Sequence, residues 1–453
     1  MPTAPSWVDA VPERRARQIV WSGFALLMVV AACWYAKKAS DGNSAFVRWR
    51  EQVRMFWFDG VNIWDKQMFP NPPIMPITML PLMLLPSIVG GAMVWFALKA
   101  GLAALSARAC VRMVEGDLDR RLVPWAEGLV LLLTLRPILS DLHHGNNNLI
   151  ILALIVGTLT AWRKGYDVLA GLALGLAITY KVTPALFVPY FLYKRSWRAV
   201  GSTFLAIGIF MLIVPSLVIG PAFNGQCLAM WWHRILAPFV AGHEMSGQEI
   251  NQSLVGVLSR LMTEPLARVD RYERLFHLYL VAWDPRVVAA VVKVISLVLV
   301  GVLAFFCRTK VRRRDDPRLL GEFSLVVLTM LFVSERSWKH HYVTLMLPFA
   351  YLVWQTLKLP RFSTPRLVLV GSLFASELLM ATTSSEVGGL FSRHQGHKLA
   401  QFYGMFLWAG VVLYIATAWR VRVEARETIE PEARVIPAPH LAEAAARTSA
   451  GRG

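Results

Sequence analysis

Two short stretches of this sequence place several side chains able to bind a substrate next to one another. Residues 140–148 read SDLHHGNNN, residues 334–341 read SERSWKHH, and each stretch lies between apolar runs. Imidazoles and carboxamides donate hydrogen bonds to anionic or sugar ligands. In the first stretch, the side chains expected to contact substrate are His143, His144, Asn146 and Asn148. The alternative is a polar turn whose asparagines cap the next helix. If the stretch does bind substrate, Asp141 could instead only orient His143 or His144.

The second stretch combines Lys339 with His340 and His341. Neighbouring side chains at a helix start diverge by about 100°, so both imidazoles are poorly placed to hold one metal ion. We therefore expect contacts with a phosphate or a hydroxyl group, and no metal. The alternative is that these three side chains lie at the membrane interface and bind no ligand.

Lys181 lies within the apolar run LAITYKVTPALF. A lysine at the centre of a membrane costs about 2.5–3.5 kcal/mol, so this residue needs a partner. A lipid phosphate is the partner we expect, and Pro184 would break the helix beside it. A lysine reaching to the interface or an internal ion pair would also satisfy the charge.

The 37–72 segment carries four carboxylates amid tryptophans and phenylalanines, a composition typical of a helix at the membrane interface. Asp41 stands where the first apolar run ends, a suitable position for a general base between a lipid-borne substrate and water. Glu51, with arginines on both flanks, is the second candidate. For Asp59 and Asp65 we favour solvated charges.

Farther along the chain, the stretch NQSLVGVLSR places Asn251 and Gln252 after the tryptophans of WWHR. Aromatic faces and amides together are typical of surfaces that hold a sugar ring. We expect both amides to contact substrate.

The elements that carry these residues are predicted to be membrane helices. The sequence is 56% hydrophobic and 17% charged, with a mean hydropathy of +0.47, which excludes an ordinary water-soluble protein. The net charge of +18 is spread over short clusters, so we expect no nucleic-acid partner. Four widely separated cysteines indicate neither a disulfide framework nor a zinc site.

Apolar runs predict an all-α bundle of about 12 crossings. They lie near residues 18–36, 73–105, 124–139, 148–163, 167–193, 197–220, 286–307, 320–335, 341–357, 366–382 and 399–419. The 73–105 run contains three prolines and predicts a kinked or re-entrant piece before one crossing. The 167–193 run predicts a hairpin that turns near Lys181.

The basic clusters between these runs all fall on one side of such a bundle. The positive-inside rule makes that side cytoplasmic, with both termini inside and the polar stretches outside. The expected organisation is a cytoplasmic N-terminus at 1–17, a membrane domain at 18–420 and a cytoplasmic, disordered tail at 421–453.

The ordered set of motifs resembles glycosyltransferase family 87, the polyprenol-phosphate-dependent mannosyltransferases of the GT-C superfamily. The motifs are DGNSAFVRW, GVNIW, FPNPPIMPITMLPLMLLP, GNNNLIILALIVG, LAGLALGLAITYKVTPALF, NQSLVGVLSR and SWKHHYVTLMLPF. The resemblance covers roughly residues 20–420. It implies a GT-C bundle of about a dozen transmembrane helices and a polyprenyl-phosphate sugar donor.

Carried over by motif, the family's base falls on Asp41 and its phosphate contact on His340 or His341. Lys181 matches the K-x-T/x-P element. Two departures matter: the glutamine of the G-Q-x-N element is here Asn146, and the spacing from Asp41 to GVNIW is longer. Because of the second departure, Glu51 stays a candidate for the general base.

These observations predict an enzyme of the plasma (inner) membrane that transfers a sugar to a lipid or glycan acceptor on the extracytoplasmic face. The family resemblance implies that the sugar is mannose. Inverting transfer with a carboxylate base needs no cofactor, since Lys181 and the histidines can stabilise the leaving phosphate. The alternative is a flippase or transporter of lipid-linked sugars. Transporters place ionisable groups near the midplane and show repeats, neither of which we find here.

Overall fold

The protein is helical throughout the part that the structure describes. The computed structural model describes residues 11–66, 69–238, 247–264, 279–391 and 396–433, and every regular element in these ranges is a helix. The predicted all-α membrane fold is therefore confirmed.

Six helices in the described ranges are long and apolar enough to cross a membrane. They are α2 (Glu13–Ser40), α6 (Ile88–Arg112), the helix formed by α12 (Trp197–Gly208), η3 (Ile209–Ile213) and α13 (Val214–Ile219), then α17 (Pro285–Phe306), α20 (Thr364–Ala381) and α23 (Met405–Ala433). The pair α7 (Val123–Leu133) and α8 (Leu135–His144) passes the same test when taken together, with a bend of 56° between the two helices. The count of about 12 crossings stays a prediction.

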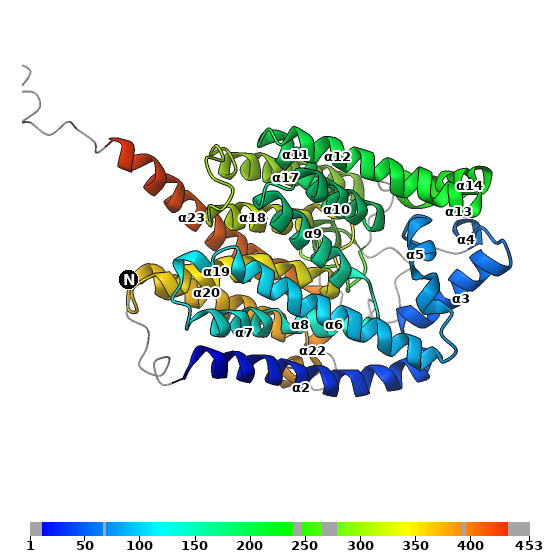
Figure 1. Ribbon diagram of the computed structural model, residues 1–453, viewed down its shortest axis with the longest axis horizontal. Coiled ribbons are helices and arrows are strands. Elements are labelled where there is room, and N and C mark those ends of the chain that lie inside the picture. Colours follow the sequence, from blue (N-terminus) through cyan, green and yellow to red (C-terminus); the bar gives the residue numbers. More distant parts are fainter. Residues whose placement is uncertain (1–10, 67–68, 239–246, 265–278, 392–395, 434–453) are drawn as a thin grey trace, which may run out of the picture.

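Shorter helices complete the bundle (Figure 1). They are α9 (Asn148–Arg163), α10 (Asp167–Tyr180), η2 (Thr183–Leu186), α11 (Phe187–Tyr193), α18 (Arg318–Val333) and α19 (Met346–Lys358). Side chains of α18 and α19 are almost all buried, whereas α2 and α17 expose leucines and valines along their length. The exposed apolar faces of these outer helices are suited to lipid.

One end of the bundle carries short helices. In Figure 1, α3 (Ala45–Phe58), α4 (Ile63–Lys66), α5 (Ile74–Met83) and α14 (Pro221–Trp231) gather at the right. As predicted, α3 is amphipathic, because it buries Phe46, Trp49 and Phe56 while Glu51 is exposed. The 73–105 run also divides as expected, into α5 and α6.

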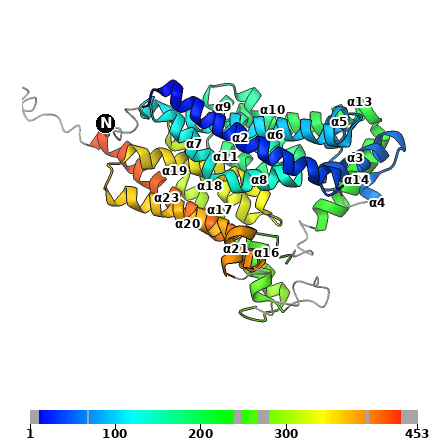
Figure 2. The ribbon, with the colours of Figure 1, turned by 90° about the horizontal axis from the view of Figure 1, so that it is seen from below.

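The remaining elements are short. They are η1 (Glu115–Asp117), η4 (Trp232–Leu236), α16 (Leu254–Met262), η6 (Lys339–Leu345), α21 (Ser385–Phe391) and α22 (Gly396–Phe402). Two of them, α16 and α21, project together from the bundle (Figure 2).

The last helix continues past the boundary expected at residue 420, as far as Ala433. Val421 is fully buried and Arg420 donates to Gln355 Oε1 at 3.0 Å, so packing extends the helix into the predicted tail. Residues 434–453 of that tail, and 1–10 of the N-terminal segment, lie outside the described residues.

Candidate active site

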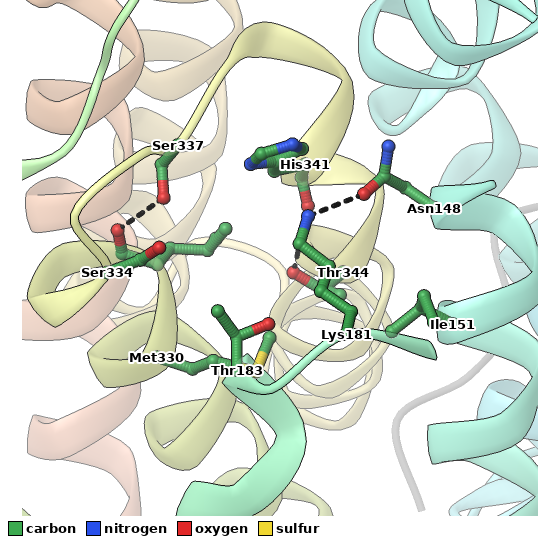
Figure 3. A pocket seen from close by; sticks show the side chains of 10 residues that line it. Asn148, Ile151, Lys181, Thr183, Met330, Ser334, Ser337, His341 and Thr344 are labelled. Atoms are coloured by element: carbon green, nitrogen blue, oxygen red, sulfur yellow. Dashed lines mark hydrogen bonds between the residues drawn. The ribbon is translucent and has the colours of Figure 1, made fainter. Parts of the chain in front are cut away.

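The polar stretches singled out in the sequence meet at the end of the bundle that carries the short helices. A small pocket opens between the start of α9, the break after α10, the end of α18 and η6 (Figure 3). We call it the lysine pocket. Its polar lining residues are Asn148, Lys181, Thr183, Ser334, Ser337, His341 and Thr344.

Lys181 enters this pocket because α10 ends at Tyr180. The backbone becomes extended at Lys181 (φ −159°, ψ 123°), and Pro184 opens η2. Its Nζ donates to Asn148 Oδ1 at 2.7 Å (Figure 3). The Nζ atom of Lys181 is therefore held by a neutral amide rather than by a carboxylate.

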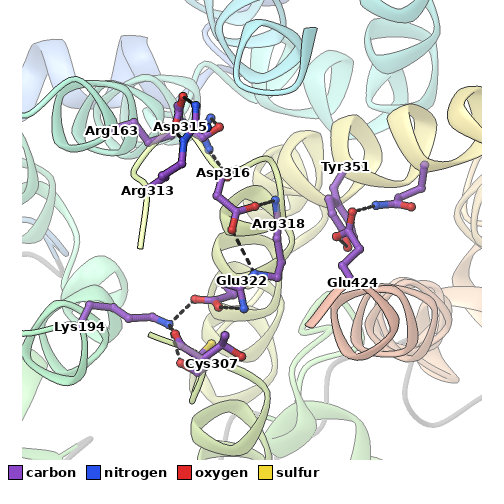
Figure 4. A network of polar contacts seen from close by, with 12 residues as sticks. Arg163, Lys194, Cys307, Arg313, Asp315, Asp316, Arg318, Glu322, Tyr351 and Glu424 are labelled. Carbon is purple, nitrogen blue, oxygen red and sulfur yellow. Dashed lines mark hydrogen bonds and ion pairs between the residues drawn. The ribbon is translucent and has the colours of Figure 1, made fainter. Parts of the chain in front are cut away.

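The chain reverses after Lys181, as the predicted hairpin requires. At the far end of the bundle Arg314 pairs with Asp167, the first residue of α10, at 2.6 Å. Lys194, just past α11, donates to the carbonyls of Cys307 and Thr309 (Figure 4). Both ends of the segment therefore reach the 307–314 region.

The 140–148 turn joins α8 to α9 through Gly145, whose φ is +75°. A Cβ atom there would lie 2.6 Å from Tyr35 Oη, and the Gly145 carbonyl accepts from Trp95 Nε1 at 2.9 Å. Glycine is thus required by both conformation and space. The turn is consequently fixed against α2 and α6.

Asp141 does not orient His143 or His144. It is fully buried, and its Oδ2 accepts from Lys99 Nζ at 3.1 Å. The contact that orients His144 is made by its Nδ1, which lies 2.8 Å from the Ser140 carbonyl oxygen. Both histidines are exposed.

The two histidines of η6 differ in burial. His340 is 2% exposed, and its Nε2 lies 2.8 Å from Asn146 Nδ2. His341 is half-buried and lines the lysine pocket, with its Nδ1 3.2 Å from the Trp338 nitrogen and 3.0 Å from the Arg336 carbonyl oxygen. Burial holds the pKa of both imidazoles well below its usual value, so both are neutral at pH 7.

Asn251 and Gln252 lie outside the pocket lining and are fully buried. Asn251 donates to the Glu335 carbonyl at 2.7 Å and accepts from the Ser337 nitrogen at 3.0 Å. The Gln252 backbone nitrogen donates to the Ser337 carbonyl at 2.7 Å, and its side-chain amide donates to the Gln401 carbonyl at 2.8 Å. Their contacts hold the 334–341 segment in place.

The candidate bases lie farther out. Asp41 caps the C-terminus of α2 and is exposed, as are Glu51 and Asp59. Asp65 lies 3.9 Å from Arg234. Neither Asp41 nor Glu51 lines the lysine pocket.

Positive groups surround the turn at this end. Lys38, in the last turn of α2, and Lys339 of η6 both act electrostatically on His143 and His144. Within the described residues, no three His, Cys, Asp or Glu side chains gather to hold a metal ion.

Comparison with known proteins assigns the chain to a family. The sequence profile of glycosyltransferase family 87 matches residues 69–335, more than half of the chain. The chain belongs to glycosyltransferase family 87. The matched range includes α5 to α18 and holds Lys181, the 140–148 turn and Asn251.

Two curated relatives of this family-87 enzyme carry the same description, polyprenol-phosphate-mannose-dependent α-(1-2)-phosphatidylinositol mannoside mannosyltransferase. The protein from Mycobacterium tuberculosis is 25% identical over 366 residues, which cover 74% of this chain and 77% of the relative. The protein from Mycolicibacterium smegmatis is 25% identical over 217 residues, covering 47% and 42%. No solved structure matches the chain.

Sequence reasoning missed Lys99, the fully buried partner of Asp141 in this family-87 glycosyltransferase. A usable signal was present, because Lys99 interrupts the apolar stretch VWFALKAGLAAL just as Lys181 interrupts its own run. A lysine inside a membrane helix calls for a carboxylate partner.

Proposed function

We propose that this family-87 glycosyltransferase transfers mannose from a polyprenyl-phosphate donor to a lipid or glycan acceptor. The observation that carries the proposal is the lysine pocket, where Lys181 and His341 meet and Lys181 is held by an amide rather than a carboxylate. The printed description of both relatives, which names a polyprenol-phosphate-mannose donor, supports the same donor here.

In this proposal Lys181 and His341 hold the donor phosphate. The Nδ1 atom of His341 is engaged by backbone atoms, so its Nε2 atom is the one available to a ligand. The His340 ring lies next to the His341 ring, and its Nε2 atom contacts Asn146 Nδ2. These groups stabilise the phosphate as it leaves with the electron pair of the broken sugar–oxygen bond.

Asp41 is the proposed general base, with Glu51 in reserve. The acceptor hydroxyl oxygen attacks the anomeric carbon from the face opposite the phosphate, and Asp41 takes its proton, so the configuration inverts. The exposed position of Asp41 at the end of α2 leaves room for an acceptor that arrives from water or from the bilayer surface.

The acceptor is proposed to carry an anionic headgroup near its reacting hydroxyl. Lys38, Lys339, His143 and His144 supply positive or hydrogen-bonding groups around the turn. The acceptor in the relatives' description, a phosphatidylinositol mannoside, has such a headgroup. Asn251 and Gln252 are assigned a positioning role, because protein atoms occupy their amides.

The proposed site faces the outside of the plasma membrane, with both described termini on the cytoplasmic side. The distribution of basic clusters supports this orientation. The reaction is proposed to need no metal, so EDTA should leave the activity unchanged, and restoration by a divalent ion after EDTA would contradict that part.

Lipid and glycan profiling of a deletion strain tests the function. One mannose-containing glycoconjugate should disappear, and its precursor, which has one sugar fewer, should accumulate. The wild-type gene should restore it and an Asp41→Asn gene should not. An unchanged profile, or loss of a glycoconjugate that lacks mannose, would contradict the proposal.

A further inference from the structure

A chain of four polar side chains leads from the middle of α6 to the lysine pocket. Lys99 and Asp141 form a fully buried ion pair at 3.1 Å. Asp141 Oδ1 accepts from Asn148 Nδ2 at 2.9 Å, and Asn148 Oδ1 accepts from Lys181 Nζ at 2.7 Å. The chain ends at the proposed phosphate-binding lysine.

Asp141 determines which way the Asn148 amide points. A carboxylate accepts hydrogen bonds but donates none, so the amide must turn its NH₂ toward Asp141. Its oxygen is thereby aimed at Lys181, as Figure 3 shows. The Asn148 backbone nitrogen also donates to Asp141 Oδ1, at 3.2 Å, which fixes the start of α9 against the same carboxylate.

Lys99 makes this arrangement stable. Besides the ion pair, its Nζ donates to the Asp141 carbonyl oxygen at 3.0 Å, so one lysine satisfies both the carboxylate and a carbonyl near the end of α8. A buried carboxylate without such a partner would be costly. The ion pair therefore joins α6, α8 and the start of α9.

We propose that Asp141 is a positioning residue that acts on Lys181 through Asn148, with Lys99 as its fixed counter-ion. We call this hydrogen-bonded chain the relay. It fixes the position of the Lys181 side chain before the donor binds, so less free energy is spent on ordering that side chain during binding. The inference rests on the proposed function, because it assumes that Lys181 binds the donor phosphate.

The test is the donor KM of the variant Lys99→Met/Asp141→Leu. Replacing a buried ion pair by apolar residues of similar volume usually preserves folding, and no charge is left unpaired. We expect the donor KM to rise about tenfold, with a detergent melting temperature close to wild type. Asn148→Leu, which keeps the ion pair, should raise the donor KM similarly.

A second buried lysine–carboxylate pair supplies the matched control. Lys194 and Glu322 lie 2.7 Å apart at the opposite end of the bundle (Figure 4). Glu322 also pairs with Arg318 at 3.7 Å, and Arg318 keeps a second carboxylate, Asp316, at 3.4 Å when Glu322 is replaced. Lys194→Met/Glu322→Leu should leave the donor KM unchanged. An equal rise in this control would overturn the proposal, since loss of any buried pair would then disturb the site.

Combining variants separates positioning from general structural loss. In a Lys181→Met background, neither Asn148→Leu nor the double replacement at 99 and 141 should raise the donor KM further. Additive effects would overturn the relay while leaving the role of Lys181 intact. An unchanged donor KM in Lys181→Met alone would instead contradict the proposed phosphate contact, and the relay with it.

Discussion

At the residue scale, the proposed chemistry divides between one exposed carboxylate and one pocket cation. Asp41→Asn keeps the size and polarity of the side chain but removes the proton acceptor. We expect the turnover rate to fall about 10²- to 10⁴-fold, with both substrates still binding. Glu51→Gln is the matched control, and a severe loss there with an active Asp41→Asn enzyme would move the base to Glu51.

Lys181→Met tests the pocket cation, because methionine retains much of the length and apolar bulk of lysine without its charge. Donor KM should rise by one to two orders of magnitude, and the acceptor KM should stay near the wild-type value. A normal donor KM in well-folded protein would rule out a phosphate contact.

Lys339 gives the site a pH dependence. Burial, with a smaller contribution from Arg136, lowers its pKa to about 8, and Glu249 opposes this shift. The ammonium is present below that pH and lost above it, so affinity for an anionic acceptor should fall as the pH rises from 7 to 9. Lys339→Arg should shift this fall to higher pH. An acceptor KM that is flat with pH in the wild type would contradict the role.

The contacts in the site were only partly predictable from the sequence. Lys181 could be singled out because a lysine in an apolar run needs a partner, yet the observed partner is the Asn148 amide. Asn251 and Gln252 have side-chain types common in sugar sites. In the fold, however, the Asn251 amide is occupied by the backbone of Glu335 and Ser337. The Gln252 amide is occupied by the Gln401 carbonyl. A hydropathy pattern shows that a charged side chain lies within a helix, but it does not identify the residue that contacts that side chain.

At the element scale, helix ends position the chemistry. The break after α10 brings Lys181 and Thr183 to the lysine pocket, and the α8–α9 turn brings Asn148. The short helix η6 brings His341 and Thr344. Apolar run lengths predicted most helix positions within a few residues. The end of α23 was not predictable in this way, because Glu424 accepts from Tyr351 Oη at 2.6 Å and from Gln355 at 2.7 Å, and these tertiary contacts stabilise a polar stretch as helix (Figure 4).

The α8–α9 turn offers a test at this scale. Gly145→Ala places a methyl group against Tyr35 Oη at a positive φ, and the backbone strain alone costs about 1–2 kcal/mol. We expect a lower melting temperature in detergent and reduced activity. Gly157→Ala in α9, where the new methyl group meets no atom within 4 Å, is the control and should melt like wild type. Equal melting of both variants would contradict the packing described for the turn.

At the scale of the whole molecule, the two ends of the bundle differ in chemistry. Histidines and the lysine pocket lie at one end, and arginine contacts such as that of Arg314 with Asp167 lie at the other. Under the positive-inside rule the arginine-bearing end is expected to face the cytoplasm, and this orientation stays a prediction. The number of membrane crossings is harder to predict, because the length of a short helix such as α10 or α11 does not show whether that helix crosses the membrane.

Single cysteines test the proposed orientation in a background where exposed Cys33 is replaced by serine. Asn43→Cys and Ser385→Cys occupy exposed positions at the site end and should react with a membrane-impermeant thiol reagent in intact cells. Arg313→Cys, exposed at the opposite end, should react only after the membrane is opened. The reverse pattern would place the site in the cytoplasm.

The central claim is transfer of mannose from a polyprenyl phosphate by this single chain. The most direct measurement incubates the purified protein in detergent with an acceptor lipid extract and either polyprenyl-phosphate [¹⁴C]mannose or a nucleotide-linked [¹⁴C]mannose. We predict labelled acceptor only from the polyprenyl donor, with loss of that product in Asp41→Asn. Because detergent leaves no second compartment, a flippase would yield no product. Label transferred from the nucleotide donor, or none from the polyprenyl donor, would contradict the account.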